Sequence, residues 1–501
     1  MNERKVGVIL SYMSIIIGIF LALIFTPFLL NSLGMENYGL FVLASSFIAY
    51  LSILDMGMND SIVRFLVKYR INGNKDEESN FLANMIIFYS FISLLVLLLG
   101  WVIYANLEIL FKDSFSESNL VLFKEMFVLI VVCVAITLFF NPITATLVAS
   151  EKFIYIRSIE ICSYLVTTLL MFIFLYNGYK SYAMIAISIS TSIAVVLFKV
   201  VFSFVKLKTK IKLVKFSFIN LTNLLKYAAP IFAVVIVEQI YWKLDNVILG
   251  SLLGPALVTI YAIGLMFHKY FMSFATAISR VMLPKVVKQI EDGATKKELT
   301  NLLVKVSRIQ AFVVLAILSG LILFGFEFIN LWIGDEYQVA YYVMLLVMVP
   351  YSLELMGNLR NTILQVKGLY WYRSFILLVL SILNIALTIY LIELWGVIGA
   401  AASTGFCVII GYIAVNMVIS YKEVIDVKCY LNQLAKGIVP AFSLTLLLGY
   451  FITLIPVTGW TGLIVKVIIF ICVYLALFYL GALNQDEKNM VNQLIKTKSK
   501  K

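Results

Sequence analysis

The chain has 501 residues, of which 62% are hydrophobic and 13% are charged, and its mean hydropathy is +1.01. This composition is too apolar for a water-soluble domain. The formal net charge of +12 is spread over the gaps between apolar segments, so it indicates anionic membrane lipid as the natural partner and excludes nucleic acid.

Apolar runs follow one another along almost the whole chain, each about 20 residues long, which is the length that crosses a bilayer. Backbone polar groups must be hydrogen-bonded inside the membrane, so each run is expected to form a helix. The sequence therefore predicts an all-α polytopic membrane protein with fourteen transmembrane helices, at residues 6–30, 38–60, 81–104, 121–147, 158–177, 182–205, 227–250, 257–282, 307–331, 339–364, 375–393, 396–420, 437–456 and 462–483.

Lysine and arginine occur in every second gap between these segments and in both tails. The remaining gaps hold only Lys112, Lys124 and Lys180. Because positively charged loops stay in the cytoplasm, both termini are predicted to be cytoplasmic. The most basic stretch, KLKTKIKLVK at 206–215, is interpreted as a topology anchor in preference to a ligand-binding site.

The residue types needed for most catalytic and metal sites are scarce. The chain has one histidine and five cysteines. The cysteines lie in predicted spans or on the cytoplasmic side, so no disulfide is expected. No glycine-rich phosphate-binding motif occurs, and the predicted outer loops are short. We therefore expect no metal site, no cofactor and no enzymatic activity.

Two pairs of segments indicate an internal repeat. LLNSLGMENYGLF at 29–41 resembles ILGSLLGPALVTIY at 248–261, which places Ser32 opposite Ser251 at an offset of 219. TLVASEKFIYIRS at 146–158 resembles TILQVKGLYWYRS at 362–374, which places Arg157 opposite Arg373 at an offset of 216. Two matches at nearly one offset indicate two copies of a six-helix unit. Because six is even, both copies have the same orientation and are related by an axis along the membrane normal.

The repeat predicts the organisation of the whole chain. The two lobes are joined by a basic cytoplasmic linker and followed by two helices outside the repeat. The predicted parts are the N-lobe at 1–205, the linker at 206–226, the C-lobe at 227–420, a cytoplasmic loop at 421–436, the two extra helices at 437–483 and a basic tail at 484–501.

This plan, together with NSLGMENYGLF at 31–41 and LDMGMNDSIVRFLVKYR at 54–70, resembles the polysaccharide flippase branch of the MATE-like multidrug/oligosaccharidyl-lipid/polysaccharide superfamily. The resemblance implies a transporter of the bacterial plasma membrane. It would move undecaprenyl-diphosphate-linked O-antigen or capsule units to the outer leaflet by alternating access. The implied partners are the lipid-linked oligosaccharide, membrane lipids and the polymerase and glycosyltransferases of the same pathway. Na⁺ or H⁺ is the expected coupling ion.

Polar side chains inside the predicted helices are candidate substrate-binding residues, because a charge at bilayer depth normally faces a cavity or a partner. In 339–364 and just beyond it, one stripe holds Glu354, Asn358, Asn361 and Gln365, whereas Arg360 is expected to point about 120° away. The stripe either lines a wet lumen or joins helices through hydrogen bonds. Both interpretations stay open.

Cationic residues in 227–250 and 257–282 are candidates for holding a diphosphate, together with Arg360. Lys243 and Lys269 are deep in their helices, whereas Arg280 lies close enough to the helix end to snorkel to the interface. Ser273 and Thr276 share the Lys269 face. We favour a lumen role for Lys269, with sugar hydroxyls bound by the neighbouring polar stripes.

Carboxylates in the helices are candidates for ion coupling. Glu238 and Asp245 are seven residues apart on one face, and Asp55 aligns with Asn59. Glu238 and Asp245 either hold an ion or a proton, or pair with Lys243 or Lys269. The Asp60–Arg64 pair is interpreted as a structural salt bridge, and Pro142 is expected to kink its helix.

A cation-coupled drug or metabolite exporter of the same superfamily is the main alternative. An exporter of cationic drugs favours an acidic pocket, so Lys243 and Lys269 weigh against it. A membrane polymerase or ligase would need a long outer loop, which is missing. A structural scaffold would not need charges inside its spans.

Overall fold

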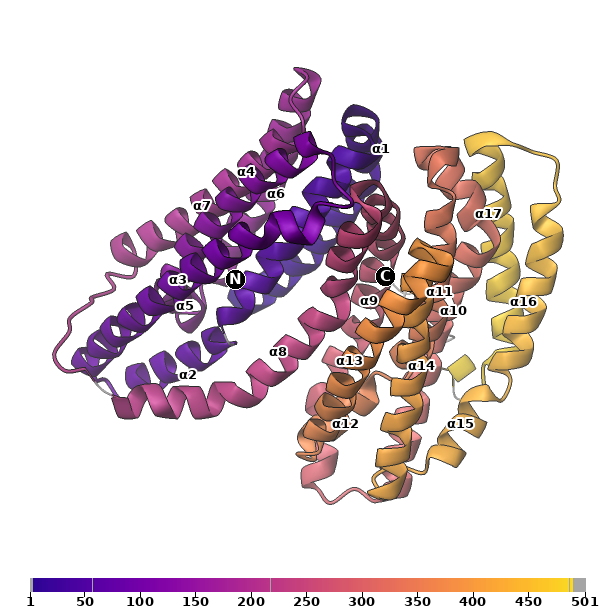
Figure 1. Cartoon of the computed structure of the whole chain (residues 1–501). Coiled ribbons are helices and arrows are strands. Elements are labelled where there is room, and N and C mark those ends of the chain that lie inside the picture. The colour runs from indigo at the N-terminus through magenta and orange to yellow at the C-terminus, as the bar shows by residue number, and fades with distance from the viewer. Residues whose placement is uncertain (1–2, 56, 217, 486, 490–501) are drawn as a thin grey trace. The chain divides into compact units, whose positions relative to one another are not determined.

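The structure is a computed structural model that describes residues 3–55, 57–216, 218–485 and 487–489. Every regular element in these ranges is a helix (Figure 1), so the all-α class predicted from the sequence is confirmed. The chain separates into two compact units, Met1–Thr259 and Ile260–Lys501.

Eleven helical segments among the described residues are long and apolar enough to cross a membrane. One of them lies in α1 (Glu3–Ser52), which covers two predicted spans and is interrupted at Gly34, where φ is 74° and ψ is 171°. Glycine adopts this backbone conformation without the steric cost that a Cβ brings. Two further predicted spans fall in α8 (Phe218–Leu253) and α9 (Pro255–Glu291), where many side chains lie outside the described set. The polytopic class is confirmed, and the count of fourteen stays a prediction.

The first unit is built around α1, which packs against α4, α6, α7 and α8. Leu29, Met171 and Met184 belong to an apolar cluster that joins α1, α6 and α7. A Cβ on Gly100 would lie 2.4 Å from Val131, so α3 and α4 approach closely through a residue without a side chain. Besides α1 and α8, the elements of this unit are η1 (Ile53–Asp55), α2 (Met58–Ile71), α3 (Lys75–Phe111), α4 (Glu117–Phe139), α5 (Asn141–Ala149), α6 (Phe153–Tyr176) and α7 (Ser181–Val205).

The boundary between the compact units lies at 259–260, whereas the sequence places the boundary between the lobes at the linker 206–226. The difference arises because α8 packs on α1, α2 and α3. Asn246 of α8 donates a hydrogen bond to Ser46 of α1 at 3.0 Å, and the Ser114 hydroxyl donates to the Gly250 carbonyl at 2.9 Å. By its contacts, α8 therefore belongs with the first unit.

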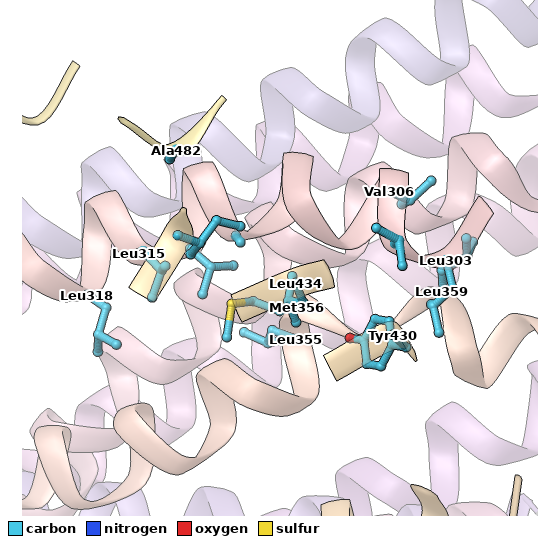
Figure 2. Packing of buried hydrophobic residues seen from close by; sticks show 14 of the residues in the cluster. Leu303, Val306, Leu315, Leu318, Leu355, Met356, Leu359, Tyr430, Leu434 and Ala482 are labelled. Atoms are coloured by element: carbon cyan, nitrogen blue, oxygen red, sulfur yellow. The ribbon is translucent and has the colours of Figure 1, made fainter. Parts of the chain in front are cut away.

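The second unit is organised by α10, which packs against α11, α15, α16 and α17. Figure 2 shows Leu303 and Leu315 of α10 in one apolar cluster with Leu355 of α11 and with Tyr430 and Leu434 of α15. Besides the main part of α9, the elements of this unit are α10 (Lys296–Ile333), η2 (Asp335–Tyr337), α11 (Val339–Met356), α12 (Leu359–Val366), α13 (Tyr370–Trp395), α14 (Val397–Tyr421), α15 (Val427–Ala435), α16 (Ile438–Thr453), α17 (Gly459–Leu477) and the π-helical turn η3 (Phe478–Ala482).

Two ion pairs connect α10 to the C-terminal part of the chain, which lies outside the predicted repeat. Arg308 forms two hydrogen bonds with Glu487, at 2.7 and 3.1 Å, and also donates to the Lys436 carbonyl at 3.0 Å. Lys466 of α17 lies 3.1 Å from Glu327 of α10. An Arg–carboxylate fork of this kind fixes orientation as well as distance. The two helices are therefore an integral part of the second unit.

The helix order supports the repeat that the sequence predicts. In the first unit α3 packs on α4, α4 on α7 and α6 on α7, and in the second α10 packs on α11, α11 on α14 and α13 on α14. Left-handed glycines recur 220 residues apart, at Gly34 and Gly254 and again at Gly73 and Gly293. The superposition of the two six-helix halves stays a prediction.

Candidate functional site: polar clusters at two broken helices

A break in a predicted membrane span places a polar cluster inside each unit. In the first unit α4 ends at Phe139 and α5 begins at Asn141, with Pro142 in the first turn of α5. Proline lacks the N–H that a continuous helix needs, and its ring clashes with the preceding turn. The predicted kink at Pro142 is confirmed, and it leaves the Asn141 side chain at the start of a helix.

The carboxylate of Asp55 is the centre of the first cluster. Its Oδ1 accepts hydrogen bonds from the Tyr89 hydroxyl at 2.7 Å and from the Asn141 Nδ2 at 2.5 Å. The three side chains come from η1, α3 and α5, which brings together segments that are far apart in the sequence. Both of these donors are neutral groups. The Asp55 carboxylate is therefore the point at which three segments of the first unit meet.

A second carboxylate of the first unit lies on α8. Asp245 is 3% exposed, and its neighbour Asn246 is 5% exposed. The Asn246 Oδ1 and the Tyr50 hydroxyl find no hydrogen-bond partner among the described residues. Unsatisfied buried oxygens next to a carboxylate are the kind of ligand that hard cations take. Lys243, two residues before Asp245, is partly exposed.

The second unit has its break at Gly357 and Asn358, between α11 and α12. Glu354, at the end of α11, accepts hydrogen bonds from Arg360 and, at 3.0 Å, from Asn361. Asn361 also donates to the Asn358 Oδ1 at 3.1 Å. The sequence places Arg360 on another face of the helix, but its guanidinium reaches the Glu354 carboxylate across the break between α11 and α12.

Arg360 is buried and contacts three side chains of the second unit. Its side chain is 1% exposed, donates to Asn416 of α14 at 2.8 Å and lies 4.9 Å from the ring centroid of Tyr412. Arg373, at the start of α13, lies 3.9 Å from Glu354 and donates to the Tyr370 hydroxyl at 2.8 Å. Two guanidinium groups therefore share one carboxylate. This geometry favours the interpretation in which the stripe joins helices through hydrogen bonds.

The other candidate residues belong to α9 and α12, or their side chains are not described. Gln365 is exposed on α12, and Lys269 is exposed on α9. His268, beside Lys269, is buried, and its ring lies 4.4 Å from that of Tyr351. The side chains of Asp60, Glu238, Ser273, Thr276 and Arg280 lie outside the described set.

The sequence analysis did not single out several residues of these clusters, among them Asn416, Tyr412 and Tyr89. Asn416 is a polar side chain in an otherwise apolar helix, so its burial could have been anticipated. Tyr412 and Tyr89 could not be singled out in this way, because tyrosine is common in the chain, with 28 residues. In the described residues no group of three or more His, Cys, Asp and Glu could hold a metal ion.

The comparison with known families is decisive for the class of protein. A family model described as "Polysaccharide biosynthesis protein" matches residues 5–290, which is more than half of the chain. The chain belongs to the polysaccharide biosynthesis protein family. A relative from Shigella flexneri is described as a putative O-antigen transporter. It is 21% identical to this chain over 390 residues, and the match covers 76% of this chain and 90% of the relative.

Solved structures agree with this family at the level of the fold. The inward closed conformation of the lipid II flippase MurJ gives a TM-score of 0.76 at 18% identity, covering 95% of this chain and 98% of that one. An inward-facing multidrug resistance MATE transporter of the MOP superfamily gives a TM-score of 0.59 at 14% identity. This match covers 77% of this chain and 92% of that transporter. The resemblance found in the sequence is confirmed, and the family and the fold both point to a multi-pass membrane transporter.

Proposed function

We propose that the protein is a flippase for lipid-linked oligosaccharides. The observation that carries the proposal is the match of residues 5–290 to the polysaccharide biosynthesis family in a chain with the MurJ-like fold. The substrate would be an undecaprenyl-diphosphate-linked O-antigen or capsule unit. It would move from the cytoplasmic to the outer leaflet of the bacterial plasma membrane, with both protein termini in the cytoplasm.

The substrate would be held through its diphosphate and its sugar hydroxyls. Lys243, Lys269, Arg280 and Arg360 supply positive charge, and an arginine can bind a phosphate with a planar fork. Of these, the exposed Lys269 is the best placed among the described side chains to meet a ligand. Arg360 is buried against Glu354 and Asn416, so it would act mainly by positioning.

Sugar hydroxyls would be bound by the polar stripe beside this cluster. Glu354, Asn358, Asn361 and Gln365 carry acceptors, and the amides also carry donors. Asn361 has a buried Oδ1 without a partner among the described residues. That oxygen could accept one hydroxyl hydrogen from a sugar or a water.

Transport would be coupled to Na⁺ or H⁺ through Asp55, Glu238 and Asp245. Asp55 accepts hydrogen bonds from Tyr89 and Asn141 and so joins three segments of the first unit. Gain or loss of a cation at Asp55 would therefore change the local charge and bias the unit between its conformations. The two lobes would alternate around the substrate by rocking. The polymerase and glycosyltransferases of the pathway remain the expected partners.

A cation-coupled drug exporter is the second candidate, favoured by the similarity to a multidrug MATE transporter. The two functions differ in the phenotype of a deletion strain. If the protein is an oligosaccharide flippase, deletion abolishes surface polysaccharide and lipid-linked repeat units accumulate inside the cell. If surface polysaccharide is unchanged and only drug susceptibility rises, the exporter is correct.

A further inference from the structure

The segment between α7 and α8 is a basic strip, which we define as residues 206–216. It carries five exposed lysines, Lys206, Lys208, Lys210, Lys212 and Lys215. Large apolar side chains are exposed between them, with Ile211 39%, Leu213 53% and Val214 66% exposed. None of the five lysines forms an ion pair with a carboxylate in the described part of the chain. The strip therefore presents charge and apolar surface together.

The backbone of the basic strip is fixed to α3. The Asn80 Oδ1 accepts the N–H groups of Val214 and Lys215, at 2.8 and 3.0 Å. The Asn84 Nδ2 donates to the Lys215 carbonyl at 3.1 Å. These bonds hold the backbone of the strip at Val214 and Lys215, whose side chains are exposed. A segment that is already ordered loses less conformational entropy when it binds a partner.

The basic strip lies where two membrane spans end. It follows directly on Val205, the last residue of α7, and it is bonded to the first turns of α3, the span Lys75–Phe111. Lysine beside exposed leucine and valine is the composition of segments at the boundary between head groups and acyl chains. There the apolar side chains leave water while the ammonium groups meet lipid phosphates.

We propose that residues 206–216 are a preformed binding strip for anionic phospholipid head groups of the leaflet that they face. The lysines bind the phosphates, and Ile211, Leu213 and Val214 enter the acyl boundary. The bonds from Asn80 and Asn84 hold the strip at the membrane surface. The proposal does not depend on the transported substrate, because it uses only the ends of two spans and the segment fixed between them.

The test uses the full-length protein in lipid nanodiscs made of phosphatidylcholine alone or of phosphatidylcholine with phosphatidylglycerol. All five native cysteines are replaced by serine, and Leu213→Cys carries an environment-sensitive fluorophore. We expect a blue-shifted emission and stronger quenching by brominated acyl chains when phosphatidylglycerol is present. Salt should reverse the effect, since it screens the attraction between lysine and phosphate.

The decisive variant replaces the five lysines of the basic strip by glutamine. The apparent affinity for phosphatidylglycerol should then fall about tenfold or more. A matched control, Lys288→Gln with Lys296→Gln and Lys297→Gln, removes exposed charge elsewhere and should keep the response. Asn80→Ala keeps every lysine and should weaken the response, because the backbone is no longer held.

The proposal is overturned if the probe gives the same emission in both lipids, or if the lipid response survives the five glutamines. Neither result would bear on the proposed flippase activity, since the readout involves no transport.

Discussion

Glu354 and Arg360 form an ion pair across the break between α11 and α12, with Arg373 only 3.9 Å from the same carboxylate. The arginine is 1% exposed, so its charge depends on the protein for compensation. Removing one partner of a buried pair leaves an uncompensated charge, which costs more than the pair itself contributes.

Glu354→Gln should therefore destabilise the protein by about 3 kcal/mol. The measurement is the thermal midpoint of the detergent-solubilised protein. Adding Arg360→Met to Glu354→Gln should recover much of the loss, because the stranded charge is removed. Gln365→Ala, at an exposed position of α12, serves as the control and should be neutral. If Glu354→Gln is as stable as the parent protein but inactive, the stripe acts on substrate and not as a structural joint.

Asp55→Asn should remove the ion dependence of transport while leaving the cluster assembled. The amide oxygen can still accept from Tyr89 and Asn141, but the charge is lost. Rates measured with and without a Na⁺ gradient, and with and without a pH gradient, should become equal in the variant. Tyr89→Phe keeps the carboxylate and should retain ion dependence. An Asp55→Asn variant that still responds to the parent's coupling ion would exclude Asp55 from coupling.

Lys243→Ala and Lys269→Ala should each stop display of surface polysaccharide in cells that contain normal amounts of the protein. A diphosphate needs positive charge to leave water, so arginine at either position should restore part of the activity. Immunoblotting gives the protein level, and polysaccharide staining gives the function. Wild-type display from both alanine variants would show that the lysines belong to an internal ion-pair network.

Topology can be tested with single cysteines in a cysteine-free background. Cysteines at Asn31, Asn119 and Gly459 should react with an impermeant reagent from outside intact cells, because the sequence places them in outer loops. Cysteines at Asn74 and Gly293 should react only after the cells are opened. Labelling of position 293 in intact cells would show that the orientation is the opposite of the predicted one.

The sequence predicted the elements well where one residue decides the local structure. Pro142 lacks the N–H that a continuous helix needs, so a kink at this position could be predicted without tertiary contacts. Proline alone does not decide a break, since Pro27 and Pro350 lie inside α1 and α11. Gly357 was not recognised as a break, because glycine is common in continuous membrane helices. The contact between Arg360 and Glu354 was therefore missed, whereas Glu354, Asn358 and Asn361 lie together as predicted.

Contacts between distant segments could not be predicted in the same way. The hydrogen bonds from Tyr89 and Asn141 to Asp55 join three segments, and nothing in the spacing of one helix indicates them. The assignment of α8 to the first unit likewise follows from its packing on α1, α2 and α3. The repeat alone places that helix with the second half.

The most direct test of the account is transport by the purified protein in liposomes. An undecaprenyl-diphosphate-linked oligosaccharide with a labelled sugar is incorporated, and its appearance on the opposite face is followed with a membrane-impermeant reagent. The account predicts rapid exposure that needs the protein and is lost in Lys269→Ala. Exposure no faster than in protein-free liposomes, from protein shown to be folded and supplied with Na⁺ and pH gradients, would contradict it.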